Sequence, residues 1–443
     1  MIIRPAKRLR GGLRLPGDKS VSHRAAILAA LARGETLVGN FSTSEDCAST
    51  LACLNRLGVE TEREGTNVRV KGVGPGGLRA PGVALDCDNS GSTMRMLAGV
   101  LAGQDFESEL TGDDSLRSRP MKRIIEPLEL MGARVESAAG RAPLRVRGRR
   151  PLQPISYRVP VASAQVKSCL LLAGLSAGGR TEVIESGGPT RDHTERMLRW
   201  LGVPVEVEMK KDDAEASRVF AVQGPAGFDA RDISVPGDIS SAAFFIAAAS
   251  LLPGSDLRME GVGLNPTRAR IVDVLRGLGA QIQVEEVREE CNEPVGTVRV
   301  KGSDEELAPQ DAGRSHVISG GLVPQLIDEL PVLAVVGTRV RGGLTIRDAA
   351  ELRVKESDRL AATAANLRAM GAVVEEHEDG LTVSGPSKLR GARLDSYGDH
   401  RITMAFAVAA LLADDESEIA GAEECVGVSF PEFFGLLESA AGR

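Results

Sequence analysis

The chain has 443 residues, more than one hydrophobic core usually supports, so its length predicts two large domains. Its formal net charge of −7 excludes a general nucleic-acid binder, because such proteins carry an excess of basic residues. No run of residues reaches the ~18 apolar positions of a membrane span, and the N-terminus lacks the apolar stretch of a signal peptide. We therefore expect a cytoplasmic protein. The six cysteines are scattered without a CxxC pair and the five histidines do not cluster, so we expect no metal site.

The nine residues PGDKSVSHR precede an apolar run and predict a tight turn that leads into a helix. Ser20 or Ser22 is expected to cap this helix, and the Ala and Leu residues that follow continue it. Free backbone N–H groups and the helix dipole favour an anion at this end, where Lys19 and Arg24 add positive charge. Taken alone, the stretch fits an ordinary helix cap with two solvated basic residues equally well.

Helical segments rich in small residues recur six times along the chain. Each opens with a polar or glycine-containing turn and closes at a Gly that leads into a strand. The six segments span 20–39, 90–112, 163–186, 240–261, 328–348 and 399–421. Such regular self-similarity indicates a repeated supersecondary unit. The abundance of Ala and Gly predicts closely packed helices.

A second signal lies between these segments, where a helix ends in a Leu-Gly or Met-Gly step and an alternating hairpin follows. The Gly fits a helix C-cap, and the V-x-V alternation fits half-buried strands that themselves end in Gly. The helix ends occur at 54–60, 128–135, 198–205, 275–282 and 367–374. The sixth copy lacks its hairpin, which the N-terminal strands within 2–15 could supply. We expect solvated hairpin tips at 208–218 and 285–294.

The pattern therefore predicts an α/β protein with six units of the order βαβαββ, three in each domain. The chain is expected to cross between the domains near its opening motif and near 228–238, where Pro and Gly again precede a helix. No nucleophile elbow, GxGxxG fingerprint or Walker loop is present. The motifs of hydrolases, dinucleotide-binding and nucleotide-binding proteins are thus absent from the sequence.

Polar and charged residues gather where the small-residue helices begin. They are Lys19, Ser20 and Arg24; Asn89, Ser90, Gly91, Ser92 and Arg95; Ser163, Gln165 and Lys167; Asp328 and Glu329; Asp399, His400 and Arg401. Further basic residues elsewhere are Arg119, Arg191, Lys355 and Arg359. Six helix N-termini directed into one space would sum several partial positive charges and hold a ligand with more than one anionic group.

Each of these residues also has a purely structural interpretation. Ser90, Ser163 and Asp328 fit simple helix caps, since Ser and Asp are favoured there. The run LRVKESDRL, with its alternating charges, fits a solvated helix face stabilised by i,i+4 pairs. The recurrence at equivalent positions of the repeat is what these interpretations explain poorly.

Eight motifs together resemble the 5-enolpyruvylshikimate-3-phosphate (EPSP) synthase family. They are PGDKSVSHR, DNSGSTMR, LTGDDSLRSRPM, VASAQVKS, TRDHTERML, IDELP, LRVKESDRL and YGDHRITMAFA, in order, between about residues 5 and 435. The resemblance implies the enolpyruvyl transferase fold, an inverse α/β barrel-like arrangement of three βαβαββ units per domain. It implies one domain of 16–232 and another of 1–15 with 233–443, and an active site in the cleft between them.

The resemblance further implies transfer of the enolpyruvyl group from phosphoenolpyruvate to the 5-hydroxyl of 3-phosphoshikimate, with release of phosphate, in aromatic amino-acid biosynthesis. It implies small-molecule substrates only, no metal or organic cofactor, no nucleic-acid or membrane partner, and a monomer. Two phosphate- and carboxylate-bearing substrates need many cationic donors, which agrees with the Arg and Lys content of the motifs.

Carried over by motif, the 3-phosphoshikimate ligands are Lys19, Ser20, Arg24, Ser163, Gln165, Arg191, Asp328 and Lys355. The phosphoenolpyruvate ligands are Lys19, Gly91, Arg119, Gln165, Arg359 and Arg401. Asp328 resembles the base at the attacking hydroxyl and Glu356 the acid that protonates the methylene carbon. Lys19 is a competing acid, and His400 supports the reaction. A positioned carboxylic acid and carboxylate suit these two proton transfers.

Two positions depart from the family pattern. Val428 stands where many relatives carry a Lys, so one phosphoenolpyruvate contact is expected to be absent or replaced. Ser92 stands beside Gly91 where Thr is usual. The alternatives are the sister transferase that acts on UDP-N-acetylglucosamine, which uses a loop Cys that LTGDDSLRSRP lacks, and a non-catalytic binder on the same scaffold. The acidic pair Asp328 and Glu356 argues against a mere binder.

Overall fold

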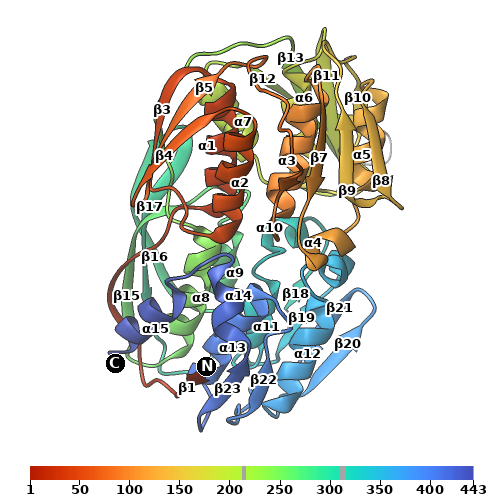
Figure 1. The fold of residues 1–443 in the computed structure, drawn as a ribbon. Coiled ribbons are helices and arrows are strands. Elements are labelled where there is room, and N and C mark those ends of the chain that lie inside the picture. The colour runs from red at the N-terminus through yellow and green to blue at the C-terminus, as the bar shows by residue number, and fades with distance from the viewer. Residues whose placement is uncertain (212–215, 310–315, 443) are drawn as a thin grey trace. The chain divides into compact units, whose positions relative to one another are not determined.

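The computed structural model describes residues 1–211, 216–309 and 316–442, which fold into helices and small sheets (Figure 1). They separate into two compact units. Unit N comprises Gly17–Val235 with Glu290–Glu293, and unit C comprises Met1–Pro16, Pro236–Glu289 and Pro294–Arg443. Each unit contains three small sheets.

Unit N contains three four-stranded sheets with one common plan. The first has the order β14 (Ile233–Ser234), β3 (Arg33–Gly39), β5 (Asn67–Val73), β4 (Glu60–Glu64). The second has the order β6 (Leu85–Asp86), β7 (Glu107–Thr111), β9 (Arg141–Arg147), β8 (Arg134–Ala138). The third has the order β10 (Ser156–Arg158), β11 (Arg180–Glu185), β13 (Ala216–Gln223), β12 (Val205–Lys211). In each, the first pair is parallel and the others are antiparallel.

Unit C follows the same plan in three further sheets. Its first sheet is β2 (Arg10–Arg14), β15 (Asp256–Gly263), β17 (Glu293–Lys301), β16 (Gln281–Glu290). Its second is β18 (Val317–Ile318), β19 (Leu344–Ile346), β21 (Gly380–Val383), β20 (Val374–His377). Its third has three strands, β22 (Arg393–Asp395), β23 (Ser417–Ala420) and β1 (Ile2–Ile3). The repeat of six units predicted from the sequence is confirmed.

The helices alternate with these strands. Unit N contains α1 (Lys19–Leu31), α2 (Glu45–Arg56), α3 (Gly91–Ala102), α4 (Asp114–Ser118), α5 (Lys122–Leu130), α6 (Ala164–Gly174) and α7 (His193–Trp200). Unit C contains α8 (Ile239–Leu251), α9 (Arg270–Gly277), α10 (Val323–Leu326), α11 (Leu330–Gly337), α12 (Arg359–Ala369), α13 (His400–Leu411), α14 (Ala422–Gly427) and α15 (Phe433–Ala441). Two 3₁₀ turns, Gly320–Leu322 and Ala350–Val354, complete unit C.

The strands that precede α1 and α8 exchange partners. In the other four repeats, the strand before the buried helix pairs with the strand after it. Here β2, which precedes α1, pairs with β15, which follows α8, and β14, which precedes α8, pairs with β3, which follows α1. The N-terminal strands thus divide their roles. Ile2–Ile3 pairs with β23 and supplies the missing strand of the sixth copy. Arg10–Arg14 does not, because it completes the β15 sheet.

One helix from each repeat is buried almost throughout, and small residues allow these helices to pack closely. In unit N, α3 and α6 lie side by side (Figure 1). A Cβ atom added to Gly99 of α3 would lie 2.2 Å from the carbonyl oxygen of Cys169 in α6. Contact this close requires Gly. In unit C, the apolar helices α8, α11 and α13 pack against one another in the same way.

Glycine also fixes the contact between strand and helix in the repeat. A Cβ atom at Gly72 would lie 2.3 Å from the Ala32 oxygen at the end of α1, and one at Gly302 would lie 1.9 Å from the Leu252 oxygen after α8. The same approach recurs at Gly148, Gly224 and Gly385. The Leu-Gly and Met-Gly steps are helix ends as predicted, with positive φ at Gly58, Gly132, Gly202, Gly279 and Gly371.

The expectation of a solvated hairpin tip at 285–294 is confirmed only in part. Strands β16 and β17 form this hairpin, and residues 286–289 are exposed, but the end of the hairpin is not solvated. Residues 290–293 belong to unit N, where Glu293 is buried and its Oε1 lies 2.7 Å from Nδ1 of His193 in α7. The Asn292 carbonyl accepts a hydrogen bond of 2.9 Å from Arg196. Charge alone misled the prediction, because these polar groups find partners in the folded chain. The other predicted tip, 208–218, lies partly outside the described residues.

We also compared the described helices with the requirements of a membrane span. None is by itself both long and apolar enough, and the bent pair Gly320–Leu326 and Leu330–Gly337 meets the requirement in length and composition only.

Candidate active-site residues

The first helix begins where the sequence predicts it, but its cap is a different residue. Asp18 accepts a hydrogen bond of 2.9 Å from the backbone N–H of Val21, so neither Ser20 nor Ser22 is the cap. Asp18 directly precedes the first helical residue, which is the position from which a side chain reaches the free N–H groups. Ser22 instead accepts a hydrogen bond of 3.0 Å from the backbone N–H of Ser42.

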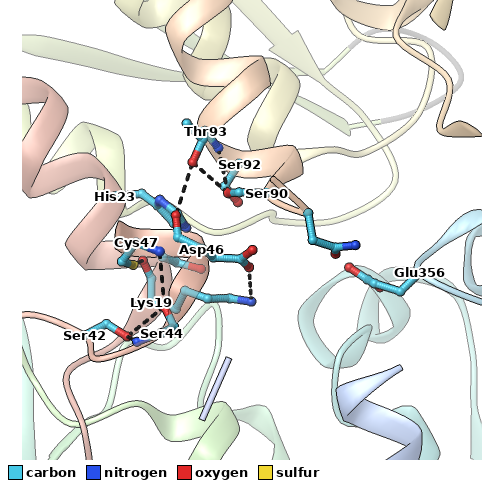
Figure 2. Close-up of polar contacts among 12 residues, drawn as sticks. Lys19, His23, Ser42, Ser44, Asp46, Cys47, Ser90, Ser92, Thr93 and Glu356 are labelled. Atoms are coloured by element: carbon cyan, nitrogen blue, oxygen red, sulfur yellow. Dashed lines mark hydrogen bonds and ion pairs between the residues drawn. The ribbon is translucent and has the colours of Figure 1, made fainter. Parts of the chain in front are cut away.

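Lys19 is mostly buried and forms an ion pair with Asp46 at the start of α2. Its Nζ lies 2.8 Å from Asp46 Oδ2, and the two side chains retain 17% and 9% exposure. Figure 2 shows this pair beside the serine and threonine hydroxyls of neighbouring helix starts. The solvated-cation interpretation of Lys19 is therefore wrong. Sequence analysis missed Asp46, although an acidic first turn after Ser44 is typical of a helix N-terminus.

Arg24 is buried among neutral oxygens rather than solvated. Its Nε donates to the Thr194 hydroxyl at 2.7 Å, Nη2 to the Ser168 hydroxyl at 2.7 Å and Nη1 to the Ser20 carbonyl at 2.8 Å. Arg191 approaches the Ser20 hydroxyl at 3.5 Å. The structure therefore brings three predicted ligands, Ser20, Arg24 and Arg191, to one place. Thr194 and Ser168 lie within the motifs TRDHTERML and VASAQVKS but were not expected as partners of Arg24, because they lie far from it along the chain.

The starts of α3 and α6 meet through Gln165. Its Nε2 donates to the Ser92 hydroxyl at 2.9 Å, and its Oε1 accepts from Arg95 at 2.6 Å. Gly91, the first residue of α3, leaves room for that arginine, since an added Cβ would lie 2.6 Å from Arg95 Nη1. Ser163 caps α6, with its hydroxyl 3.5 Å from the Val166 nitrogen.

Arg119 lies at the end of α4 and is buried. Its Nη2 donates to Asn89 Oδ1 at 2.7 Å and to the Ser115 hydroxyl at 3.1 Å. An added Cβ at Gly91 would lie 3.5 Å from Arg119 Nη1, so this guanidinium borders the start of α3. Arg119 thus lies beside Gly91, which is also adjacent to Ser92, a hydrogen-bond partner of Gln165.

Lys167 does not belong with these cations. The sequence placed it at the start of a helix with Ser163 and Gln165, but its side chain is fully buried inside unit N. Its Nζ lies 3.0 Å from Glu185 Oε2 and 2.8 Å from Glu195 Oε1. A residue two positions along a helix points to another face, which is why the motif misplaced it.

In unit C, Arg359 binds three carboxylates. Its Nε lies 2.8 Å from Asp399 Oδ2, Nη1 lies 3.3 Å from Asp328 Oδ1, and Nη2 contacts Glu356 Oε2. The Arg359 and Asp399 side chains are almost fully buried, whereas Asp328 and Glu356 each retain 18% exposure. The run around Arg359 is therefore not a solvated helix face. Asp328 is not the cap of α11, which begins after Glu329 without a side-chain cap.

Lys355 lies beside this carboxylate group. Its Nζ is 3.9 Å from Glu351 Oε1 and its side chain is 27% exposed. Burial lowers the pKa of the Lys355 ammonium, and Glu351, Asp328 and Glu356 oppose that shift. A half-buried ammonium beside carboxylates can donate hydrogen bonds to the oxygens of a ligand.

The start of α13 carries His400 and Arg401, both buried. Asp399 caps this helix by accepting from the Arg401 backbone N–H at 2.8 Å. The Arg401 guanidinium lies 5.9 Å from the Phe244 ring and donates to the Ser240 carbonyl at 3.3 Å. The fourth helix start, for which no site residue was expected, thus contributes Ser240 as a partner of Arg401.

Val428 departs from the family pattern, and the structure places it, half-buried, at the end of α14. Within 1–211, 216–309 and 316–442, no group of three or more His, Cys, Asp or Glu side chains is arranged to hold a metal ion.

The sequence and the structure were compared with known proteins. The family EPSP synthase (3-phosphoshikimate 1-carboxyvinyltransferase) matches residues 3–437. A 3-phosphoshikimate 1-carboxyvinyltransferase of Koribacter versatilis is 52% identical, covering 100% of this chain and 99% of its own. One from Salinibacter ruber is 50% identical, covering 98% and 97%.

Solved structures agree with these relatives. An EPSP synthase from Acinetobacter baumannii superimposes with a TM-score of 0.83 at 40% identity, covering 99% of this chain and 97% of its own. The enolpyruvyl transferase NikO from Streptomyces tendae has a TM-score of 0.75 at 18% identity, covering 99% and 96%, and shows the fold alone. Fold and relatives together define a transferase with the enolpyruvyl transferase fold. Within that class, the chain belongs to the EPSP synthase family.

Proposed function

We propose that the chain transfers the enolpyruvyl group of phosphoenolpyruvate to the 5-hydroxyl of 3-phosphoshikimate and releases phosphate, as a step in aromatic amino-acid biosynthesis. The observation that carries this proposal is the set of side chains at the helix starts. Unit N supplies buried arginines among hydroxyls and amides, and unit C supplies two mostly buried carboxylates that contact one arginine. These are the groups that the two anionic substrates and the two proton transfers require.

In this proposal, 3-phosphoshikimate binds to the group around Arg24. A hydroxyl can rotate to donate or accept a hydrogen bond, and a guanidinium can donate two hydrogen bonds to a phosphate. This combination of hydroxyls and guanidinium groups therefore suits a phosphate monoester. Ser20, Arg24, Arg191, Ser163 and Gln165 hold its phosphate and carboxylate. The remaining part of 3-phosphoshikimate is bound by Lys19, Asp328 and Lys355.

Phosphoenolpyruvate is assigned to a second set of residues. Arg119, Gln165 and Gly91 lie together in unit N, and Arg359 and Arg401 are buried at helix starts of unit C. Lys19 contributes to both substrates. The proposal divides the chain into one domain of 16–232 and another of 1–15 with 233–443.

The chemical step is assigned to Asp328 and Glu356. Asp328 takes the proton from the attacking 5-hydroxyl while Glu356 gives a proton to the methylene carbon, so the bond from oxygen to C2 of phosphoenolpyruvate forms. Loss of phosphate and of the added proton then restores the double bond. Arg359 contacts both carboxylates and fixes their positions. Lys19 competes with Glu356 as the acid, and His400 supports the reaction.

The test is an assay of phosphate release with purified protein, phosphoenolpyruvate and 3-phosphoshikimate, and with UDP-N-acetylglucosamine as the control acceptor. In the presence of phosphoenolpyruvate, we expect turnover with 3-phosphoshikimate as the acceptor and none with UDP-N-acetylglucosamine. Turnover with the nucleotide sugar, or none with either acceptor while both substrates bind, would contradict the proposal. We further propose a monomeric cytoplasmic enzyme that works without nucleic-acid, membrane, metal or cofactor partners. Sedimentation and assays in chelator check the oligomeric state and metal independence.

A further inference from the structure

The buried lysine of α6 is a charged group that the proposed reaction does not use. Lys167 Nζ contacts Glu185 and Glu195, and it lies 4.1 Å from the centroid of the Phe220 ring on β13. All three charged side chains are shielded from solvent. A charge removed from water is costly unless it is paired with good geometry, so this cluster holds its members in one arrangement.

The cluster is connected to the Arg24 group through adjacent residues on two helices. On α6, Lys167 is followed by Ser168, and on α7, Glu195 is preceded by Thr194. The hydroxyls of Ser168 and Thr194 lie 2.7 Å apart, and each accepts a hydrogen bond from Arg24. The ion pair between Lys167 and Glu195 therefore fixes the distance between the two helices that hold the guanidinium.

A third connection passes through the segment that carries Arg191. Glu185 ends β11, and its second carboxylate oxygen accepts a hydrogen bond from the Thr190 hydroxyl. Thr190 is buried and directly precedes Arg191. The same carboxylate thus binds Lys167 through one oxygen and the Arg191 segment through the other.

We infer that Lys167, Glu185 and Glu195 are positioning residues for the phosphate site, holding Arg24 and Arg191 in the geometry that binds 3-phosphoshikimate. The inference rests on the proposed assignment of Arg24 and Arg191 to that substrate. It predicts selectivity, because the contacts of the cluster lead to the proposed phosphoshikimate ligands Arg24 and Arg191. Its loss should weaken one substrate and spare the other.

The principal test neutralises the whole cluster in the full-length protein, with the triple variant Lys167→Met, Glu185→Gln and Glu195→Gln, so that no buried charge is left unpaired. The KM for 3-phosphoshikimate, and its Kd by calorimetry, should rise by about tenfold or more, because small displacements of a binding group have large effects. The KM for phosphoenolpyruvate and kcat at saturation should stay within about twofold. Equal changes in all three quantities would reduce the cluster to general structural support and overturn the inference.

Two single variants complete the design. Thr190→Val removes one buried hydrogen bond with almost no change in shape and should raise the KM for 3-phosphoshikimate by about threefold. If the triple variant does not fold, Thr190→Val tests the inference by itself. An unchanged KM for 3-phosphoshikimate in Thr190→Val would then overturn the inference. Phe220→Leu loosens the packing beside Lys167 but keeps both ion pairs, so it serves as the matched control and should leave that KM unchanged.

Arg24→Lys separates this inference from the function on which it rests. If Arg24→Lys weakens 3-phosphoshikimate binding while the triple variant and Thr190→Val do not, the positioning role is wrong and the proposed site stands. If Arg24→Lys binds 3-phosphoshikimate as well as the wild type does, the proposed site itself is wrong.

Discussion

Units N and C share one repeat, yet Arg24 of unit N and Arg359 of unit C, both buried, have different hydrogen-bond partners. Arg24 of unit N donates to two hydroxyls and a carbonyl, whereas Arg359 of unit C contacts three carboxylates. Hydroxyls can turn to meet an arriving phosphate, whereas ionised carboxylates only accept hydrogen bonds and repel an anion. In the proposed assignment, the group around Arg24 therefore binds a phosphate, and the carboxylates beside Arg359 transfer protons.

The comparison teaches that fold and chemistry are separable in this chain. In both units, several candidate residues begin a helix: Lys19 begins α1, Gly91 begins α3, Arg359 begins α12 and His400 begins α13. If the comparison holds, substitution of Asp328 or Glu356 should act mainly on kcat, and substitution of Arg24 mainly on the KM for 3-phosphoshikimate.

The largest expected effect is on the proposed acid and base. Asp328→Asn and Glu356→Gln should each lower kcat by about two to four orders of magnitude, because a proton transfer loses its partner, while calorimetric binding of 3-phosphoshikimate changes little. Asp273→Asn replaces an exposed carboxylate of unit C that pairs with Arg270, and it should leave kcat unchanged. Normal turnover by both site variants would remove the distinction between the units.

The next effect concerns stability. Arg359→Met should lower the free energy of unfolding by about 3–5 kcal/mol, because buried Asp399 loses its counter-charge. Chemical denaturation followed by circular dichroism measures the loss. Arg353→Met is the matched control, since Arg353 also pairs with two carboxylates, Asp358 and Glu376, but is 27% exposed, so that a loss of about 1 kcal/mol or less is expected. Equal losses would show that burial does not distinguish the two arginines.

A smaller effect tests whether the scaffolds are equivalent. Gly72→Ala in unit N and Gly302→Ala in unit C should each cost about 1–3 kcal/mol, because the added methyl group meets a helix carbonyl in both. Gly12→Ala, where no atom lies within 4 Å of the added Cβ, should change stability by about 0.5 kcal/mol or less. Thermal unfolding compares the three variants. A loss confined to one unit would contradict the equivalence of the repeats.

The smallest effect is a pH dependence within unit N. Burial, assisted by Lys19 and Arg24, lowers the pKa of His23 well below its ordinary value of 6.5. Below about pH 6.5, His23 therefore binds a proton in the unfolded chain but not in the folded chain. The contribution of His23 to stability is fully present above that pH and is lost as the pH is lowered. Thermal midpoints at about pH 7.5 and about pH 5.5 should differ less for His23→Asn than for the wild type. Identical differences would show that His23 does not contribute.

The sequence by itself determined the repeat. Helix periodicity, the Leu-Gly steps and the strand-ending glycines act locally, since a positive φ at Gly58 or a close contact at Gly72 is required by the neighbouring backbone. The order of six helices and their polar starts could therefore be predicted, as could the family, because its motifs are contiguous stretches of sequence.

Only the tertiary structure decided which side chains meet. Arg24 finds Ser168 and Thr194 far along the chain, Lys19 finds Asp46 on another helix, and Lys167 turns inward to two carboxylates. The pairing of β2 with β15 and of β14 with β3, in exchanged positions, was equally invisible. The physical reason is that a charged side chain is placed by partners brought together in space, and spacing along one segment carries no record of them.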